Sequence, residues 1–236
     1  MTSWSEIWNK RSLNSKDAGS PVALADLLRV NGYDTSTAGQ VSGQDFEQYH
    51  RYISEKCRVL PGDSLFEVGM GGGAFLLPWY QNGHPVGGLD YSRSLVSIAR
   101  RAMPDAQNEF MAAEASGLDT TKRYDIVLSN GVFLYFPDHR YARTVAEKMI
   151  QKATKTIAIL DVPDQAQQEE TEKFRRSSLP PGEYETRYQG LEHLYFPRSW
   201  FSELADAHGL AISIFDQDIH NYGNSRFRFN VVMKKE

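Results

Sequence analysis

Short apolar runs, each long enough for one buried strand, recur along this chain from residue 64 onwards. They are rich in Val, Ile, Leu and Phe, and they cover residues 64–69, 85–90, 108–112, 124–129, 156–161, 210–215 and 226–233. Segments with helix-start or helix-stop signals separate most of them, at residues 74–82, 92–102, 138–152 and 197–208. This alternation predicts an α/β protein with a doubly wound parallel sheet.

The last two runs follow each other too closely to continue that arrangement. Only residues 216–225 separate run 210–215 from run 226–233, whereas a parallel crossover needs about a dozen residues or more and usually contains a helix. We therefore expect a seven-stranded sheet whose last strand is antiparallel.

The residues before the first strand have a helical pattern. Ser20-Pro21 is a good helix start, with an N-cap serine and a first-turn proline, and the helix is expected to end at Asn31-Gly32. A second helix is expected at residues 43–58. We predict that residues 1–60 form a helical cap of the same domain, in front of an α/β core at residues 61–236.

A polar, charged insertion at residues 163–196 follows the fifth strand. Its first part, residues 165–176, is expected to be helical. The insertion supplies Tyr188, His193 and Tyr195 as candidate lid residues over a ligand.

A glycine-rich loop follows the first strand and opens the next helix. Glu67 lies at the end of the strand, and Gly69, Gly71 and Gly73 follow it. Glycine is needed where the backbone has positive φ, or where a ligand lies against the main chain without room for a Cβ. The free N–H groups at the start of the helix then face that ligand.

Two ligand classes fit this loop. Gly69, Gly71 and Ala74, with Asp90 about 20 residues further on, fit the dinucleotide pattern and its ribose-binding acid. Glu67 with Gly69 and Gly71 instead fits the E-x-G-x-G motif of enzymes that bind S-adenosylmethionine. A glycine-rich turn without a ligand is the third interpretation.

Residues 60–236 resemble the class I S-adenosylmethionine-dependent methyltransferases, whose parallel sheet ends in a β-hairpin. The resemblance rests on the segment 67–73, on Asp90 after the second strand, on Glu114 after the third, and on the fourth-strand segment 125–136. It implies S-adenosylmethionine as the cofactor and S-adenosylhomocysteine as its product. The cofactor-binding residues that it implies are Glu67, Gly69, Gly71, Gly73, Asp90, Tyr91, Glu114, Ser129, Asn130 and Phe133.

The sequence departs from the family pattern in two places. The third-strand motif is Ala113-Glu114-Ala115 in place of an Asp-aliphatic pair, which leaves the adenine contact open. The segment 129–132 replaces the DPPY-type motif of enzymes that methylate amino groups of DNA bases, which argues against such an acceptor.

Ligands of open α/β sheets bind beyond the carboxyl ends of the strands, and this rule selects the acceptor-site candidates. The candidate catalytic bases are His193, Asp161 and His220, and the candidate substrate-binding residues are Tyr135, His139, Tyr188, Tyr195, Tyr222 and Asn224. No His, Cys and Asp cluster has metal-ligand spacing, so no metal is expected.

The composition of the chain excludes several classes of partner. A net charge of −4 and a pI of about 5.9 indicate no nucleic-acid partner. The single cysteine, Cys57, excludes an internal disulfide. No signal-peptide pattern and no apolar run of about 18 residues occurs, so we expect a cytoplasmic protein without a membrane partner, as a monomer or homodimer.

The predicted function is therefore methyl transfer from S-adenosylmethionine to O or N of a small polar metabolite, such as a sugar or a hydroxylated or natural-product acceptor. An NAD(P)-dependent oxidoreductase is the first alternative. A non-catalytic module that binds S-adenosylmethionine or S-adenosylhomocysteine is the second.

Overall fold

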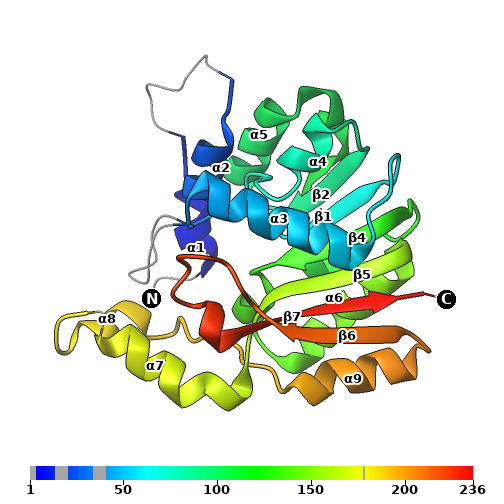
Figure 1. The fold of residues 1–236 in the computed structure, drawn as a ribbon. Coiled ribbons are helices and arrows are strands. Elements are labelled where there is room, and N and C mark those ends of the chain that lie inside the picture. The colour runs from blue at the N-terminus through cyan, green and yellow to red at the C-terminus, as the bar shows by residue number, and fades with distance from the viewer. Residues whose placement is uncertain (1–3, 14–20, 34–40, 178, 236) are drawn as a thin grey trace.

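A seven-stranded sheet in the order β3-β2-β1-β4-β5-β7-β6 runs through the computed structural model of the chain (Figure 1). The structure describes residues 4–13, 21–33, 41–177 and 179–235. The strands are β1 (Leu65–Val68), β2 (Val86–Asp90), β3 (Phe110–Ala112), β4 (Tyr124–Asn130), β5 (Ala153–Pro163), β6 (Ala211–Asp216) and β7 (Arg228–Lys234). Strands β1 to β5 pair in parallel, and β7 lies antiparallel between β5 and β6. The expected fold class, including the antiparallel last strand, is confirmed.

The strand order places the ligand crevice. The chain moves outward from β1 through β2 to β3, and then returns to the other side of β1 with β4. At such a switch point, the connections that leave the neighbouring strands diverge to opposite faces and leave a crevice beyond the carboxyl ends. The crevice therefore lies at the ends of β1 and β4, next to the glycine loop.

Two apolar cores cover the two faces of the sheet. One core contains side chains of α4 (Leu77–Gln81) and α5 (Arg93–Ala102), and the other contains side chains of α6 (His139–Lys152) and α9 (Arg198–Ala207). Each helix presents apolar residues at helical spacing to its core, such as Leu95, Ile98 and Ala99 in α5. Helices on both faces make this a doubly wound sheet.

Three helices precede β1, namely α1 (Trp4–Asn9), α2 (Leu24–Val30) and α3 (Gly43–Cys57). Helices α2 and α3 share one core with α4 and α5, and α3 lies across the front of the sheet in Figure 1. Ser42 caps α3, because its Oγ accepts the Asp45 N–H at 3.1 Å while the Asp45 carboxylate accepts the Ser42 N–H.

Some boundaries differ from the sequence expectation. The helix expected from Ser20-Pro21 begins only at Leu24, where Asp26 accepts the Ala23 N–H; Ser20 itself and the linker at residues 34–39 lie outside the described residues. The helix expected from residue 74 begins at Leu77, because the preceding residues form turns of the glycine loop. Helix α1 was not expected, because its six residues are too few for a clear helical period.

The insertion after β5 is helical, as expected for its first part. It contains α7 (Gln168–Ser177) and α8 (Glu183–Tyr188), which lie beside the ends of β5 and β7 in Figure 1. Among the described residues, no helix is long and apolar enough to cross a membrane.

Candidate active site

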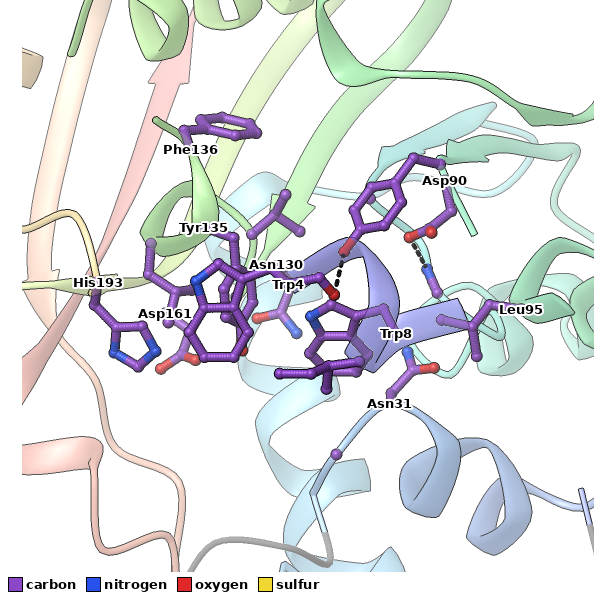
Figure 2. A pocket seen from close by; sticks show the side chains of 18 of the residues that line it. Trp4, Trp8, Asn31, Asp90, Leu95, Asn130, Tyr135, Phe136, Asp161 and His193 are labelled. Atoms are coloured by element: carbon purple, nitrogen blue, oxygen red, sulfur yellow. Dashed lines mark hydrogen bonds between the residues drawn. The ribbon is translucent and has the colours of Figure 1, made fainter. Parts of the chain in front are cut away.

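A cavity of about 730 Å³ lies beyond the carboxyl ends of β1, β2, β4 and β5 (Figure 2). The glycine loop forms part of its wall, and α1, α7 and the start of β7 complete it. Small-molecule and cofactor sites commonly have volumes of roughly 300–1,000 Å³. The cavity is therefore large enough for a nucleoside-type cofactor with a small second ligand.

Asp90 is positioned by two backbone N–H groups. Its Oδ2 accepts the Gly71 N–H at 2.9 Å and its Oδ1 accepts the Ser92 N–H at 2.8 Å. Burial raises the pKa of Asp90, these two hydrogen bonds lower it, and the charge of Glu114 raises it again. A carboxylate has about four lone-pair sites, so two remain for the hydroxyls of a ribose.

Glu67 lacks a partner for one of its oxygens. The residue is 2% exposed at the end of β1, and within the described part of the chain its Oε2 has no hydrogen-bond donor. Burial raises the pKa of Glu67 well above its ordinary value, and the nearby Asp90 charge raises it further. A cationic N–H donor at this point would satisfy the oxygen and stabilise the carboxylate.

Asn31 is hydrogen-bonded to the glycine loop. This residue ends α2, and its Oδ1 accepts the Gly72 N–H at 2.7 Å while its Nδ2 donates to the Met70 carbonyl at 3.2 Å. A Cβ on Gly71, which has φ +56°, would lie 2.6 Å from Asn31 Oδ1. Gly71 is therefore required both by its backbone conformation and by the approach of α2.

Helix α1 lies over the cavity. The Tyr91 hydroxyl donates to the Trp4 carbonyl at 3.3 Å, and the Trp4 ring lies 4.7 Å from Tyr135 and 5.4 Å from His193, measured between ring centroids. The Trp8 ring lies 5.6 Å from Tyr135, again between ring centroids, and Figure 2 shows both tryptophans among the lining side chains.

Asp161 stands at the far side of the cavity, in the left-handed backbone region with φ +56°. Asn230 Oδ1 accepts its N–H at 2.9 Å, Gln217 Nε2 donates to its Oδ1 at 3.1 Å, and the Tyr222 hydroxyl donates to its Oδ2 at 3.3 Å. This conformation is uncommon in residues other than glycine, and such strained positions cluster at functional sites. Two lone-pair sites of the carboxylate remain for a ligand.

Tyr33 and Asn130 form a second polar group beside Asp161. Asn130 Nδ2 donates to the Tyr33 hydroxyl oxygen at 2.6 Å, and within the described residues Asn130 Oδ1 is buried without a donor. Burial raises the pKa of Tyr33 well above its ordinary value, and the Asp161 charge raises it further. The Tyr33 phenol therefore keeps its proton and can donate it to a hydrogen bond in the cavity.

His193 is neutral in this arrangement. Arg175 Nη1 lies 3.1 Å from His193 Nδ1, and a guanidinium can only donate, so Nδ1 accepts and Nε2 carries the proton. Burial lowers the pKa of His193 well below its ordinary value, and the charges of Arg175 and Arg228 lower it further. Neither ring nitrogen then offers a lone pair to a ligand.

Most of the site residues expected from the sequence line this one cavity. They are Glu67, Gly69, Gly71, Asp90, Tyr91, Glu114, Asn130, Tyr135, Asp161, Tyr188, His193, Tyr222 and Asn224. Residues of the third strand end, the fourth-strand loop, the insertion and the β6–β7 turn are thus brought together, as the carboxyl-end rule predicts.

Three expected cofactor residues lie away from the cavity lining. Gly73 faces the apolar core, where a Cβ would lie 2.5 Å from Met103 Cε. Ser129 is fully buried inside β4, and Phe133 is 1% exposed among core aromatics such as Phe196. These three residues are therefore buried near the cavity without lining it.

Three expected acceptor-site residues also lie elsewhere. His139 Nε2 donates to the Tyr195 carbonyl at 2.9 Å, and neither residue lines the cavity. The His220 side chain is 73% exposed and lies 2.8 Å from an oxygen of Asp45, the residue that helps to cap α3. His220 therefore lies on the outer surface, where it contacts the cap helix.

Sequence reasoning missed several residues of the cavity wall, namely Trp4, Asn31, Tyr33, Arg175 and Arg228. Asn31 was interpreted only as a helix stop. Arg228 carried a usable signal, because a charged residue inside an otherwise apolar strand is rarely buried without a partner.

The unpartnered atoms of the site fit S-adenosylmethionine. Its ammonium would donate to the buried Glu67 Oε2 and Asn130 Oδ1, and its ribose hydroxyls would donate to Asp90. Gly69 and Gly71 line the cavity with main chain alone. The residues present therefore suit the cofactor that the sequence predicts.

Comparisons with known proteins also point to a methyltransferase domain. A family model described as a methyltransferase domain matches residues 66–158. The chain is 33% identical over 106 residues to the nonribosomal peptide synthetase dtxS1 of Metarhizium robertsii. The aligned segment covers 42% of this chain and 1% of that protein. It is 25% identical over 126 residues to malonyl-[acyl-carrier protein] O-methyltransferase 1 of Ilyobacter polytropus, 50% of this chain and 46% of that protein. The chain thus spans less than half the length of either curated relative.

A solved structure shows the same fold. Magnesium protoporphyrin IX methyltransferase (ChlM) from Synechocystis PCC 6803, with bound S-adenosylhomocysteine, superposes with a TM-score of 0.56 at 18% sequence identity, over 81% of this chain and 80% of that one. The family model, the antiparallel β7 and the Glu67–Gly71 loop together favour the methyltransferase over the oxidoreductase alternative. Residues 66–158 therefore match a methyltransferase domain, and the fold of the chain is that of the class I S-adenosylmethionine-dependent methyltransferases.

Proposed function

We propose that this chain transfers a methyl group from S-adenosylmethionine to an oxygen or nitrogen of a small polar acceptor. The observation that carries the proposal is one continuous cavity with Glu67 and Asp90 at one side and Asp161 at the other. Its volume of about 730 Å³ suits a small acceptor beside the cofactor. The net charge of −4 does not favour a nucleic-acid acceptor.

We assign a separate role in methyl transfer to each group of residues in the cavity. When bound, S-adenosylmethionine supplies an electrophilic methyl group on a sulfonium. Asp161 accepts the proton that a hydroxyl loses as its oxygen attacks, or that an ammonium loses before the amine attacks, and the Tyr33 hydroxyl donates a hydrogen bond that orients the acceptor. Trp4 and Tyr135 keep water out of the cavity. We assign the role of base to Asp161 because both nitrogens of His193 are occupied by protons or donors.

The decisive experiment is calorimetric titration of the full chain with S-adenosylmethionine and S-adenosylhomocysteine, beside Asp90→Ala. The substitution removes the acceptor of two ribose hydroxyls, so both dissociation constants should rise by roughly 10- to 100-fold. Glu169→Ala, on the exposed side of α7, is the control and should leave both constants unchanged.

Two results would oppose the proposal. Folded wild-type protein that binds neither compound would remove its basis. Binding without methyl transfer to any hydroxyl, amine or acid acceptor in a broad screen would favour the non-catalytic binding module.

Asn31→Ala tests the support of the glycine loop by α2. The change removes the two hydrogen bonds to Gly72 N and the Met70 carbonyl and leaves both groups part-buried. We expect the S-adenosylhomocysteine dissociation constant to rise about tenfold and the free energy of unfolding to fall by about 1–3 kcal/mol. Calorimetry measures the dissociation constant, and urea unfolding measures the free energy of unfolding. An unchanged dissociation constant would show that the glycine loop keeps its shape without the two hydrogen bonds of Asn31.

A further inference from the structure

Most of the charges that line the cavity are divided between its two sides, and Arg11, which follows α1 and lies over the Trp8 ring, is a further cation of the lining. The carboxylates of Glu67, Asp90 and Glu114 lie at the ends of β1, β2 and β3, whereas Arg228 begins β7 and Arg175 lies on α7. In the sheet, β7 is four strands away from β2, which is roughly 19 Å at about 4.8 Å per strand. The acidic side suits a cofactor with a sulfonium and an ammonium, and the basic side lies beyond it.

Arg228 is a buried cation with an unused donor. The residue is 5% exposed, and its Nη1 donates to the Asp161 carbonyl at 3.3 Å. Its Nε–H is buried without an acceptor among the described residues. A buried, unpaired guanidinium N–H is costly, and a ligand oxygen in the cavity would satisfy it.

Arg175 adds a second guanidinium on the same side. It donates to His193 Nδ1 at 3.1 Å, and its guanidinium carbon lies 4.3 Å from the centre of the Tyr188 ring. Arg175, Arg228 and His193 all line the cavity, and the charges of both arginines lower the pKa of His193. With His193 neutral, the single carboxylate of Asp161 leaves this side of the cavity with a net positive charge.

We propose that the methyl acceptor carries a carboxylate or phosphate group, and that Arg228 and Arg175 bind this group. The proposal rests on the proposed function, because it names the acceptor of the same site. Two planar guanidinium groups match the oxygens of a carboxylate or phosphate in a geometry that lysine does not offer. The anion is the recognition group, and it keeps the acceptor's hydroxyl or amine on the side of Asp161 and Tyr33.

The test is calorimetric titration of the full chain, saturated with S-adenosylhomocysteine, with benzoate, phenyl phosphate and benzamide. Benzoate and phenyl phosphate present the two anions on one small aromatic body, and benzamide is the neutral counterpart of benzoate. We expect at least one anion to bind about tenfold or more tightly than benzamide. Whichever anion binds more tightly identifies the group as carboxylate or phosphate.

Arg228→Gln and Arg175→Gln should each weaken binding of that anion about tenfold or more and leave benzamide unaffected. Their affinity for S-adenosylhomocysteine should stay within about twofold of wild type. Arg176→Gln is the matched control and should change nothing, because Arg176 lies next to Arg175 on α7 but pairs with Glu172 and Glu185 on the exposed surface. Retained affinity for S-adenosylhomocysteine also shows that each variant is folded. If Arg228→Gln does not fold, the result for Arg175→Gln alone decides the test.

The outcomes separate this proposal from the proposed function. Normal S-adenosylhomocysteine binding with no preference for either anion, or no anion binding at about 10 mM, overturns the anionic acceptor alone. Loss of S-adenosylhomocysteine binding in both arginine variants shows that the arginines hold the methionine carboxylate instead, which also overturns it. Wild-type protein that does not bind S-adenosylhomocysteine overturns both proposals.

Discussion

Asp161→Asn is expected to lower the rate of methyl transfer by about 10²- to 10⁴-fold, the usual contribution of a positioned general base. Asparagine retains the size of aspartate but cannot accept the proton of an attacking hydroxyl, or the proton that an ammonium must lose before its amine attacks. The measurement is the initial rate at saturating S-adenosylmethionine, with an acceptor identified by the screen described above. The affinity for S-adenosylhomocysteine should not change, because Asp161 lies on the acceptor side of the cavity.

The substitution should preserve the fold for two reasons. Asparagine tolerates the left-handed conformation of this position, φ +56°, better than most residues. Its Oδ1 can still accept the hydrogen bond from Gln217 Nε2. A loss of activity in Asp161→Asn is therefore a loss of chemistry rather than of structure.

His193→Gln is the matched comparison. Glutamine can retain the hydrogen bond from Arg175, so we expect a fall in rate of less than about tenfold, well below that of a lost general base. The opposite order of effects, with His193→Gln the more damaging, would return the role of base to His193. Equal activity of Asp161→Asn and wild type would mean that Asp161 is not the base.

Gly69→Ala is expected to lower the free energy of unfolding by about 3 kcal/mol or more and to abolish measurable cofactor binding. Gly69 has φ +74°, and an added Cβ would lie 2.4 Å from Val132 Cγ2 and 2.8 Å from Val132 Cγ1. Valine is stiff about χ1, so either the glycine loop or the loop after β4 must move. Both loops line the cavity.

Gly83→Ala provides the control for backbone strain. Gly83 has a similar φ of +82°, but a Cβ there would meet nothing within 4 Å. The free energy of unfolding of Gly83→Ala should therefore fall only by the cost of the left-handed conformation, about 1–2 kcal/mol. The variant should bind S-adenosylhomocysteine normally. Urea unfolding and calorimetry compare the two variants; equal losses in both would show that the close approach of Val132 has no effect.

The cofactor side of the site could be predicted from contiguous residues. Gly69, Gly71 and Gly73 have positive φ values, as a tight glycine turn requires, and Asp90 ends β2 as a ribose-binding acid should. Each signal is local: an apolar strand, a turn that only glycine adopts easily, and an acid at the strand end. The short β6–β7 connection likewise specified the antiparallel strand through chain length alone.

The acceptor side depends on contacts between distant parts of the chain. Asn130 and Tyr33, which are 97 residues apart in sequence, meet in one hydrogen bond, and Arg228 reaches Asp161 across 67 residues. No local pattern marks such pairs, so the sequence could not show that Asn130 meets Tyr33 or that Arg228 meets Asp161. The sequence by itself determined the sheet, its direction changes and the cofactor loop, because periodicity and glycine stereochemistry act within a few residues. Only the tertiary structure decided which polar side chains face the acceptor, because that choice follows from how α1, α2, α7 and β7 pack around the strand ends.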